Sequence, residues 1–497
     1  MSATTTPTLP APTTASRTLT RQSRAAWLLV LLVAAVSLPA PAPAAALIVY
    51  GSPRVVPGAG GCLRDPRLEP LTDQDCPGAA LGLIGAQAVS VTADGRSVYV
   101  AGEGGLAALA RDRATGALRP ATSPSPRACI ATATNGRCAT SDGALSGADA
   151  LATSPDDRFV YVGAVNAATV SGFRRGRDGV LVPLARSGRG SARGKRSHSS
   201  PYVSCVSGVT LAHTPRPRCG AHVYGLDGVA ALVVSPDGRS LYAVSYGLAP
   251  GEDSVITLQR DPRTGGLRPL PGKLGCVQSL PGRGCPPLAG LEGATAITVS
   301  PDGRFVYVAS ELSGAVRGFV RDRSTGALTP LHGRGGCISS GNRAAGDVRC
   351  AVTVPQLAGA RSLALSPDGR ELYVAAFDPG AVVVLRRNPR SGALAAGPPN
   401  CLQAASDASC PLGLPLLHGA SALAMAAHGS AVYVISVGGN SLVELLRNPA
   451  DGALSLGSNS PTALGPLTGP VALALSPQGH SIYVASPLDN AVAGFTS

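Results

Sequence analysis

Three groups of residues in this 497-residue sequence could take part in chemistry. The most varied group consists of acidic and basic side chains that stand at two recurring places of an internal repeat: Asp149, Asp227, Glu292, Arg361 and His418. A carboxylate can act as a general base toward water, and a nearby cation or donor can stabilise a developing oxyanion. These five side chains are therefore candidates for ligand binding or for hydrolysis.

The twelve cysteines form the second group, and they fall into six close pairs: Cys62 with Cys76, Cys129 with Cys138, Cys205 with Cys219, Cys276 with Cys285, Cys337 with Cys350, and Cys401 with Cys410. The members of each pair are 9 to 14 residues apart. Metal binding would favour close C-x2-C spacing or interleaved histidines, and the sequence has neither. The pattern predicts one local disulfide per pair, formed in an oxidising compartment, with no metal site and no cofactor.

The third group is a basic segment within the longest spacing between repeats: Arg174, Arg175, Arg177, Arg186, Arg189, Arg193, Lys195 and Arg196. Asp178 is the single acid among them. The segment could attract an anionic envelope surface, or it could be a solvated loop. No aromatic residue is interleaved with the charges, so nucleic-acid binding is not indicated.

A repeated segment, VSPDGRFVYVA in its clearest form, supplies the framework for these groups. It occurs seven times, with successive anchor residues 50 to 81 positions apart: Asp94, Asp156, Asp237, Asp302, Asp368, His428 and Gln478. A tyrosine stands five residues after every anchor: Tyr99, Tyr161, Tyr242, Tyr307, Tyr373, Tyr433 and Tyr483. Such a repeat is the first feature that any fold prediction must explain.

Each repeat is expected to form four short strands. In the fifth copy these cover residues 360–365, 371–375 and 381–385, and a fourth strand opens at 393–394. The Ser-Pro-Asp-Gly turn separates the first two strands, because Pro fixes φ and Gly allows a tight reversal. Seven such units predict an all-β fold, a seven-bladed β-propeller with four-stranded blades, whose radial repetition leaves only short strand edges exposed.

The last repeat stops at its third strand, over residues 491–497. Residues 54–62 match residues 268–276, the segment that contains the end of the third repeat's fourth strand. We therefore expect the N-terminal strand to complete the last blade and close the ring. On this interpretation residues 47–497 form one domain.

Composition and the N-terminal segment limit the alternatives. Charged residues make up 14% and hydrophobic residues 44% of the chain, which excludes disorder, while 62 Gly and 43 Pro exclude long helices. Three arginines precede an apolar run over residues 25–38, and small residues follow at 42–46, as in a secretory signal peptide. The 14-residue run is short for a membrane span, so we expect a signal over 1–46 rather than a retained anchor. The net charge of +13 makes the protein basic.

The candidate residues lie where the repeats differ from one another. A leucine eleven residues before the anchor and a glycine nine residues before it recur in all seven copies, whereas the residues ten and seven before it vary. These variable places flank the start of the innermost strand, where seven strands converge at one mouth of the central channel. Polar concave mouths are common ligand sites, although solvated channel-lining groups would look the same in sequence.

Residues 300–309 followed by 325–328, of the pattern S-P-D-G-R-x-h-Y-V and then T-G-x-L, resemble bacterial propellers with the Tyr-Val-Thr-Asn repeat, and more closely the lactonase-like seven-bladed propellers. The resemblance covers the whole of residues 47–497. It implies lactone ring opening by an Arg-His pair on a first strand and a Glu after the second strand.

Arg361 occupies the arginine place of that resemblance, but Ser362 follows it, and Phe377 stands at the place of the glutamate. The best matching glutamate, Glu311, belongs to the preceding repeat, so the set is divided between repeats. G-x-S-x-G, H-E-x-x-H, Walker A and G-x-G-x-x-G patterns are absent from the sequence.

Two hypotheses result. The leading one is an exported, disulfide-stapled propeller that acts as a rigid binding module for a small molecule or protein at the channel mouth. The alternative is a lactonase-like hydrolase that uses the mouth residues, with candidates Arg361, His418, Glu292, Asp227, Asp149 and Glu311. We expect a monomer, secreted or held in the cell envelope, without a transmembrane helix once the signal is removed.

Overall fold

The computed structural model describes residues 53–67, 76–121, 128–132, 138–141, 143–184, 202–209, 219–247, 253–281, 284–341, 350–397, 401–406, 410, 412–457, 462–465 and 467–496. All of them belong to one compact unit, Tyr50–Ser497. The expected signal over 1–46 and residues 186–196 of the basic segment lie outside the described residues. No helix within the described ranges has both the length and the apolar character needed to cross a bilayer.

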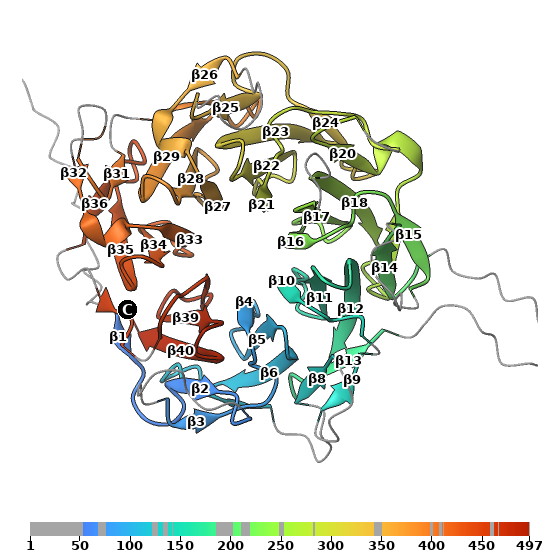
Figure 1. Cartoon of the computed structure of the whole chain (residues 1–497), viewed down its shortest axis with the longest axis vertical. Helices are drawn as coiled ribbons and strands as arrows, with labels where there is room; N and C mark the ends of the chain where they lie inside the picture. The colour runs from blue at the N-terminus through green and yellow to red at the C-terminus, as the bar shows by residue number, and fades with distance from the viewer. Residues whose placement is uncertain are drawn as a thin grey trace, which may run out of the picture. The chain divides into compact units, whose positions relative to one another are not determined.

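Seven antiparallel sheets are arranged in a ring (Figure 1). The innermost strands are β4 (Ala86–Val91), β10 (Ala148–Thr153), β16 (Val229–Val234), β21 (Ala294–Val299), β27 (Ala360–Leu365), β33 (Ala420–Met425) and β38 (Ala472–Leu475). Each innermost strand contacts those of both neighbouring blades, and β38 contacts β4. The prediction of an all-β, seven-bladed propeller is therefore confirmed.

The second strands carry the repeated tyrosines and form the centre of the core. They are β5 (Ser97–Gly102), β11 (Phe159–Ala164), β17 (Ser240–Ser245), β22 (Phe305–Ser310), β28 (Glu371–Ala376), β34 (Ala431–Ser436) and β39 (Ser481–Ser486). Every residue of all seven strands is buried. One face of each strand packs on the preceding blade and the other on the following blade, which explains their continuous apolar sequences.

The third strands are β6 (Gly105–Arg111), β12 (Thr169–Arg175), β18 (Ser254–Arg260), β23 (Ala315–Arg321), β29 (Ala381–Arg387), β35 (Ser441–Arg447) and β40 (Ala491–Thr496). Short outer segments pair with their C-terminal halves: β7 (Leu118–Pro120), β13 (Leu181–Pro183), β19 (Leu267–Pro269), β24 (Leu328–Pro330), β30 (Leu394–Ala396), β36 (Leu454–Leu456) and β1 (Arg54–Val55). These segments are the predicted fourth strands.

The fourth strand is nevertheless not continuous, which corrects the simple four-stranded blade. A second segment pairs with the N-terminal half of each third strand: β8 (Cys129–Ala131), β14 (Cys205–Gly208), β20 (Cys276–Gln278), β25 (Cys337–Ser339), β31 (Leu402–Gln403), β37 (Thr462–Ala463) and β2 (Cys62–Arg64). Five blades add a parallel edge strand: β3 (Gly78–Ala79), β9 (Ala139–Thr140), β15 (Ala221–Val223), β26 (Val352–Thr353) and β32 (Leu412–Gly413). Three short 3-10 turns complete the described elements: η1 (Gly272–Leu274), η2 (Pro355–Leu357) and η3 (Pro415–Leu417).

The six predicted cysteine pairs are all bonded, with Cα atoms 4.8 to 5.4 Å apart. The bonds join Cys62 to Cys76, Cys129 to Cys138, Cys205 to Cys219, Cys276 to Cys285, Cys337 to Cys350, and Cys401 to Cys410. In each, the first cysteine begins or precedes the second outer segment, and the chain then loops back to the blade edge. The disulfides therefore pin the outer edge of the blades, at the end where the innermost strand begins, instead of surrounding the channel itself.

Ring closure also follows the prediction. Strand β1 pairs with β40 through Arg54↔Thr496 and Val55↔Phe495, and β2 pairs with the first half of β40. The N-terminal segment thus supplies the outer strand of the seventh blade (Figure 1).

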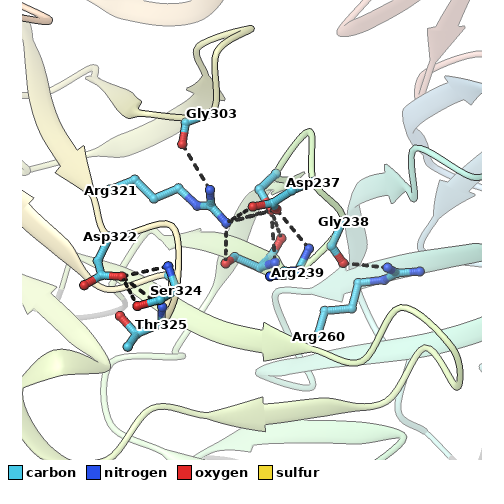
Figure 2. Close-up of polar contacts among 12 residues, drawn as sticks. Asp237, Gly238, Arg239, Arg260, Gly303, Arg321, Asp322, Ser324 and Thr325 are labelled. Atoms are coloured by element: carbon cyan, nitrogen blue, oxygen red, sulfur yellow. Dashed lines mark hydrogen bonds and ion pairs between the residues drawn. The ribbon is translucent and has the colours of Figure 1, made fainter.

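The other end of each blade carries the Ser-Pro-Asp-Gly turn and the Thr-Gly turn, and we call it the turn face. There the tyrosine of one blade donates its hydroxyl to a Gly carbonyl of the next blade, as in Tyr242 to Gly326 at 2.7 Å. An arginine that ends the next third strand, Arg321, donates to the same hydroxyl at 2.8 Å and to Asp237 at 2.9 Å (Figure 2). The anchor aspartate is therefore a partner across the blade junction as well as a turn residue.

Five blade junctions repeat this Asp-Arg contact: Asp94–Arg175, Asp156–Arg260, Asp237–Arg321, Asp302–Arg387 and Asp368–Arg447. The arginine side chains are 0 to 11% exposed. Arg175, which the sequence analysis counted in the basic segment, is thus part of the framework and is not available to an external anion.

Candidate functional site

The mouth, which we define as the end of the ring opposite the turn face, is shaped by the seven recurring glycines. All have φ between 59° and 107°: Gly85, Gly147, Gly228, Gly293, Gly359, Gly419 and Gly469. Residues other than glycine rarely adopt this left-handed region, which explains the recurrence. In blades two to six the glycine carbonyl then accepts the N–H of the residue after the second strand, as from Glu311 to Gly293 at 2.7 Å. This bond fixes the turn between the second and third strands beside the start of the innermost strand.

The variable residue seven places before the anchor occupies a β-bulge in six of the seven innermost strands. The register shifts at Gln87, Asp149, Ala230, Thr295, Arg361 and Ser421. A bulge leaves one residue outside the regular pairing and turns its side chain away from the direction of its neighbours. The position is therefore free to vary, and its side chain is aimed by the bulge.

Arg361, at the bulge of the fifth blade, contacts Glu311 from the turn of the fourth blade. Its Nη2 lies 2.6 Å from Glu311 Oε1, and its guanidinium lies 3.8 Å from the centroid of the Phe377 ring. The two charged side chains are 33% and 21% exposed, so solvent reaches both. Among the described residues no partner accepts from the buried Nε of Arg361. Glu311 belongs to a different repeat from Arg361, but the packing of blade four against blade five brings the two side chains into contact.

His418 belongs to the next blade on the other side. The Phe377 ring lies against Gly419, where a Cβ atom would come within 3.3 Å of the ring. The imidazole of His418 is exposed and lies over Gly438, and the His418 carbonyl accepts the N–H of Gly439 at 3.1 Å. The Phe377 ring therefore lies between Arg361 of blade five and the 418–419 segment of blade six.

Asp149 is separate from this group and lies at the bulge of the second blade. Its burial, and next the charge of Glu103 in the first blade, raise the pKa of the Asp149 carboxyl to about 6. Glu103 follows a second strand at the place that Glu311 holds in the fourth blade. Glu103 is not among the candidates predicted from the sequence, although the position that it shares with Glu311 is a signal that identifies it.

Glu292 and Asp227 lie in the fourth and third blades. Burial, and next the charge of Asp253, raise the pKa of Glu292 above its usual 4.5. Asp227 is only 3% exposed, and its N–H donates to Ser245 Oγ at 2.8 Å. It therefore does not present itself to a ligand at the mouth, which corrects its inclusion among the mouth-lining candidates.

The mouth residues thus do not form one pocket around a single centre. The structure joins Arg361 with Glu311 and sets Phe377 and His418 beside them, while Asp149 and Glu292 each face another acid in other parts of the ring. The described residues contain no group of three or more His, Cys, Asp or Glu side chains arranged to hold a metal ion. The arrangement around Arg361 combines a fixed cation, a carboxylate and an aromatic ring, which suits an oxygen-rich ligand.

Comparison with known proteins agrees with this architecture. The family described as lactonase, a seven-bladed β-propeller, matches residues 210–337 and 345–496. No curated protein matches the chain.

Several solved structures are similar to this chain. A putative 6-phosphogluconolactonase of Bacteroides fragilis is 17% identical, with a TM-score of 0.50 over 78% of this chain and 86% of that one. A putative 6-phosphogluconolactonase of Bacteroides uniformis is 21% identical over 76% of this chain and 85% of that one, with a TM-score of 0.49. A periplasmic gluconolactonase of Pseudomonas aeruginosa is 20% identical over 76% and 86% of the two chains, with a TM-score of 0.48.

Proposed function

The chain belongs to the lactonase family of seven-bladed β-propellers, and from that premise we propose that the group around Arg361 is a small-ligand site and that the protein is a binding module outside the cytoplasm. The contact between Arg361 and Glu311 carries this proposal. It joins two blades at the mouth at 2.6 Å, and the Phe377 ring fixes the guanidinium from a third direction. A site whose side chains are already held in place loses little conformational freedom on binding.

The ligand that fits best is a small hydroxylated molecule that bears a carbonyl or carboxylate oxygen. Glu311 can accept hydrogen bonds from hydroxyl groups, and Arg361 can donate to a carbonyl or carboxylate oxygen. The exposed imidazole of His418 and the face of Phe377 would border such a ligand on the side of blade six.

A second candidate function, lactone hydrolysis, is favoured by the same Glu311–Arg361 contact. Glu311 would remove a proton from water, whose oxygen attacks the lactone carbonyl carbon, and Arg361 would stabilise the oxyanion. The ring C–O bond then breaks, and the leaving oxygen takes up the proton to give a hydroxy acid. The division of these residues between repeats, which argued against hydrolysis in the sequence, is no obstacle in the folded chain.

The experiment that separates the two functions uses a panel of aldonolactones and the matching aldonic acids. Binding is measured by calorimetry and ring opening by acid release, for the wild type, Arg361→Ala, Glu311→Gln and the matched control Glu103→Gln. Binding without turnover, lost in the first two variants only, supports the binding module. Turnover that falls about a hundredfold in these two variants, but not in the control, supports hydrolysis. Neither binding nor turnover with any member contradicts both.

The location outside the cytoplasm rests on the predicted signal and on six local disulfides. N-terminal sequencing of exported protein should begin near Leu47, and its intact mass should lie about 12 Da below that of the reduced form, two hydrogens per bridge. Thiols that react with an alkylating agent without prior reduction would contradict this location.

A further inference from the structure

The turn face gathers two turns from every blade. Because successive strands of a blade are antiparallel, the turn between the first and second strands lies at the same end as the turn between the third and fourth. Contacts between blades confirm that the two kinds of turn adjoin, as where Tyr161 of one blade donates to the Gly265 carbonyl of the next at 2.7 Å. The face therefore carries a regular ring of alternating turns.

Ten exposed arginines occupy these turns. Five follow the Ser-Pro-Asp-Gly type turn and five stand in the turn before the Thr-Gly or equivalent pair: Arg96, Arg158, Arg239, Arg304, Arg370, Arg113, Arg177, Arg263, Arg323 and Arg390. They differ from the buried arginines at the ends of the third strands, which face the blade junctions. The repeat thus places one arginine set inside the framework and another outside it.

The negative charges at this face do not cancel the exposed set. The five anchor aspartates pair with buried arginines, and Glu371 pairs with one of these, Arg447, at 2.5 Å. Six further aspartates lie on the turns: Asp112, Asp157, Asp178, Asp261, Asp322 and Asp451. Ten exposed arginines against six aspartates leave the face with an excess of positive charge.

Arg239 follows Asp237 at the junction of blades three and four (Figure 2). Arg239 and Arg323 border an open recess of about 480 Å³ with Asp237 and Ser324. Asp237 is already engaged by Arg321 at 2.9 Å, whereas the side chains of Arg239 and Arg323 make no hydrogen bond or ion pair to any described residue. Two free guanidinium groups beside one recess suit an anionic group the size of a phosphate.

We propose that the turn face docks on an anionic phospholipid surface, with headgroup phosphates contacting the exposed arginines and one of them occupying the recess between Arg239 and Arg323. The ring repeats its arginines from blade to blade at one end of the sheets, so a planar partner can meet many of them at once. A linear polyanion would follow only part of the ring, and therefore matches this distribution less well. Docking by this face leaves the mouth, at the opposite end of the blades, open to solution.

The test uses the exported protein, without the signal predicted over 1–46, and vesicles of phosphatidylcholine alone or mixed with phosphatidylglycerol. Each arginine near an anionic bilayer is expected to strengthen binding about fivefold. We expect sedimentation with the anionic vesicles only, decreasing as salt is raised. The triple variant Arg239→Gln, Arg323→Gln, Arg390→Gln should bind about a hundredfold more weakly than the wild type.

A matched control removes the same charge from the outer edge of the blades, with Arg64→Gln, Lys273→Gln and Arg334→Gln. This control should lose much less affinity than the turn-face variant, and both should unfold at the wild-type temperature. If both variants lost the same affinity for anionic vesicles, binding would depend on net charge alone, and the proposal would be overturned. If the turn-face variant bound the vesicles as tightly as the wild type, another basic segment would be responsible for the affinity. If the wild type bound soluble polyphosphate but not vesicles, the partner of the turn face would be a polymer. Either result would overturn the proposal.

Discussion

Two arginines that each bridge neighbouring blades illustrate how the two ends of the propeller differ. At the turn face Arg321 is fully buried and contacts Asp237 at 2.9 Å, and the same contact recurs at four other junctions. At the mouth Arg361 is 33% exposed and contacts Glu311 at 2.6 Å, an ion pair that the described residues do not repeat at other blades. The Asp-Arg contact at the turn face recurs because it belongs to the scaffold. The solvent-accessible contact of Arg361 with Glu311 marks the place where a blade differs from the others.

Two acids, Asp237 at the turn face and Asp149 at the mouth, have pKa values shifted in opposite directions. Burial acts to raise the pKa of Asp237, but hydrogen bonds from Ser235, the Arg239 backbone and Arg321 outweigh it and lower the pKa below 3.8. At the mouth, burial and next the charge of Glu103 raise the pKa of Asp149 to about 6. The surroundings of Asp237 therefore stabilise its charged form, whereas those of Asp149 disfavour the charge.

Arg321→Ala should be the most destabilising change. It removes a fully buried guanidinium that donates hydrogen bonds to Tyr242, Gly303 and Ser240, and leaving these buried groups without that donor should lower the free energy of unfolding by about 3 kcal/mol. Arg361→Ala, in a solvent-accessible pair, should lower it by less than about 1 kcal/mol. Urea unfolding of both variants measures the difference. Equal losses would show that the two ends do not differ as described.

Asp149→Asn should raise the free energy of unfolding, whereas the two arginine substitutions lower it. The folded-state pKa of Asp149 is about 6 against 3.8 for the free group, so the folded protein binds the proton more tightly and loses stability as pH rises from about 4 to 6. The asparagine variant should therefore be more stable than the wild type at pH 7, by about 1 to 2 kcal/mol, and equal to it near pH 3.5. Thermal unfolding across this pH range tests it, and a pH-independent difference would assign the effect to packing.

Glu444→Gln at the junction of blades six and seven should give the smallest change. The tyrosine there, Tyr433, donates to Glu444 at 2.9 Å, whereas its counterparts donate to a Gly carbonyl of the next blade. Burial raises the pKa of Glu444 despite the Tyr433 hydrogen bond, so the neutral amide should stabilise the protein slightly at neutral pH, by less than about 1 kcal/mol. A large loss of stability would show that the charge of Glu444 is required at this junction.

Much of the fold could be predicted because its information is local in sequence. The first strand of the fifth blade runs over Ala360–Leu365 as expected, and the second and third extend beyond the predicted ends by one and two residues. The disulfides and the closing strand also follow from short-range spacing and from a matched segment. The interruption of the fourth strand was not predicted, because it depends on how the outer edge pairs with both halves of the third strand.

The sequence predicts where the candidate residues lie in the blade, but not the contacts that they make with one another. The variable places do lie at the mouth, but the bulge at Arg361 and the burial of Asp227 have no signal in a single repeat. Arg361 and Glu311 stand in different repeats, so a comparison of equivalent positions places them apart. Such a comparison does not reveal that a side chain of one blade contacts a residue of the neighbouring blade.

The sequence by itself determined the number of blades, the burial of the seven tyrosines, the pairing of the cysteines and the closure of the ring. Each depends on a periodic pattern or a short loop, which any chain with the same spacing would satisfy. Only the tertiary structure decided that Glu311 meets Arg361, that the anchor aspartates are engaged by buried arginines, and that ten other arginines remain exposed on one face. These contacts join residues 50 or more positions apart in the sequence, so they form only when the ring closes. They also depend on the β-bulges that direct side chains toward the neighbouring blade.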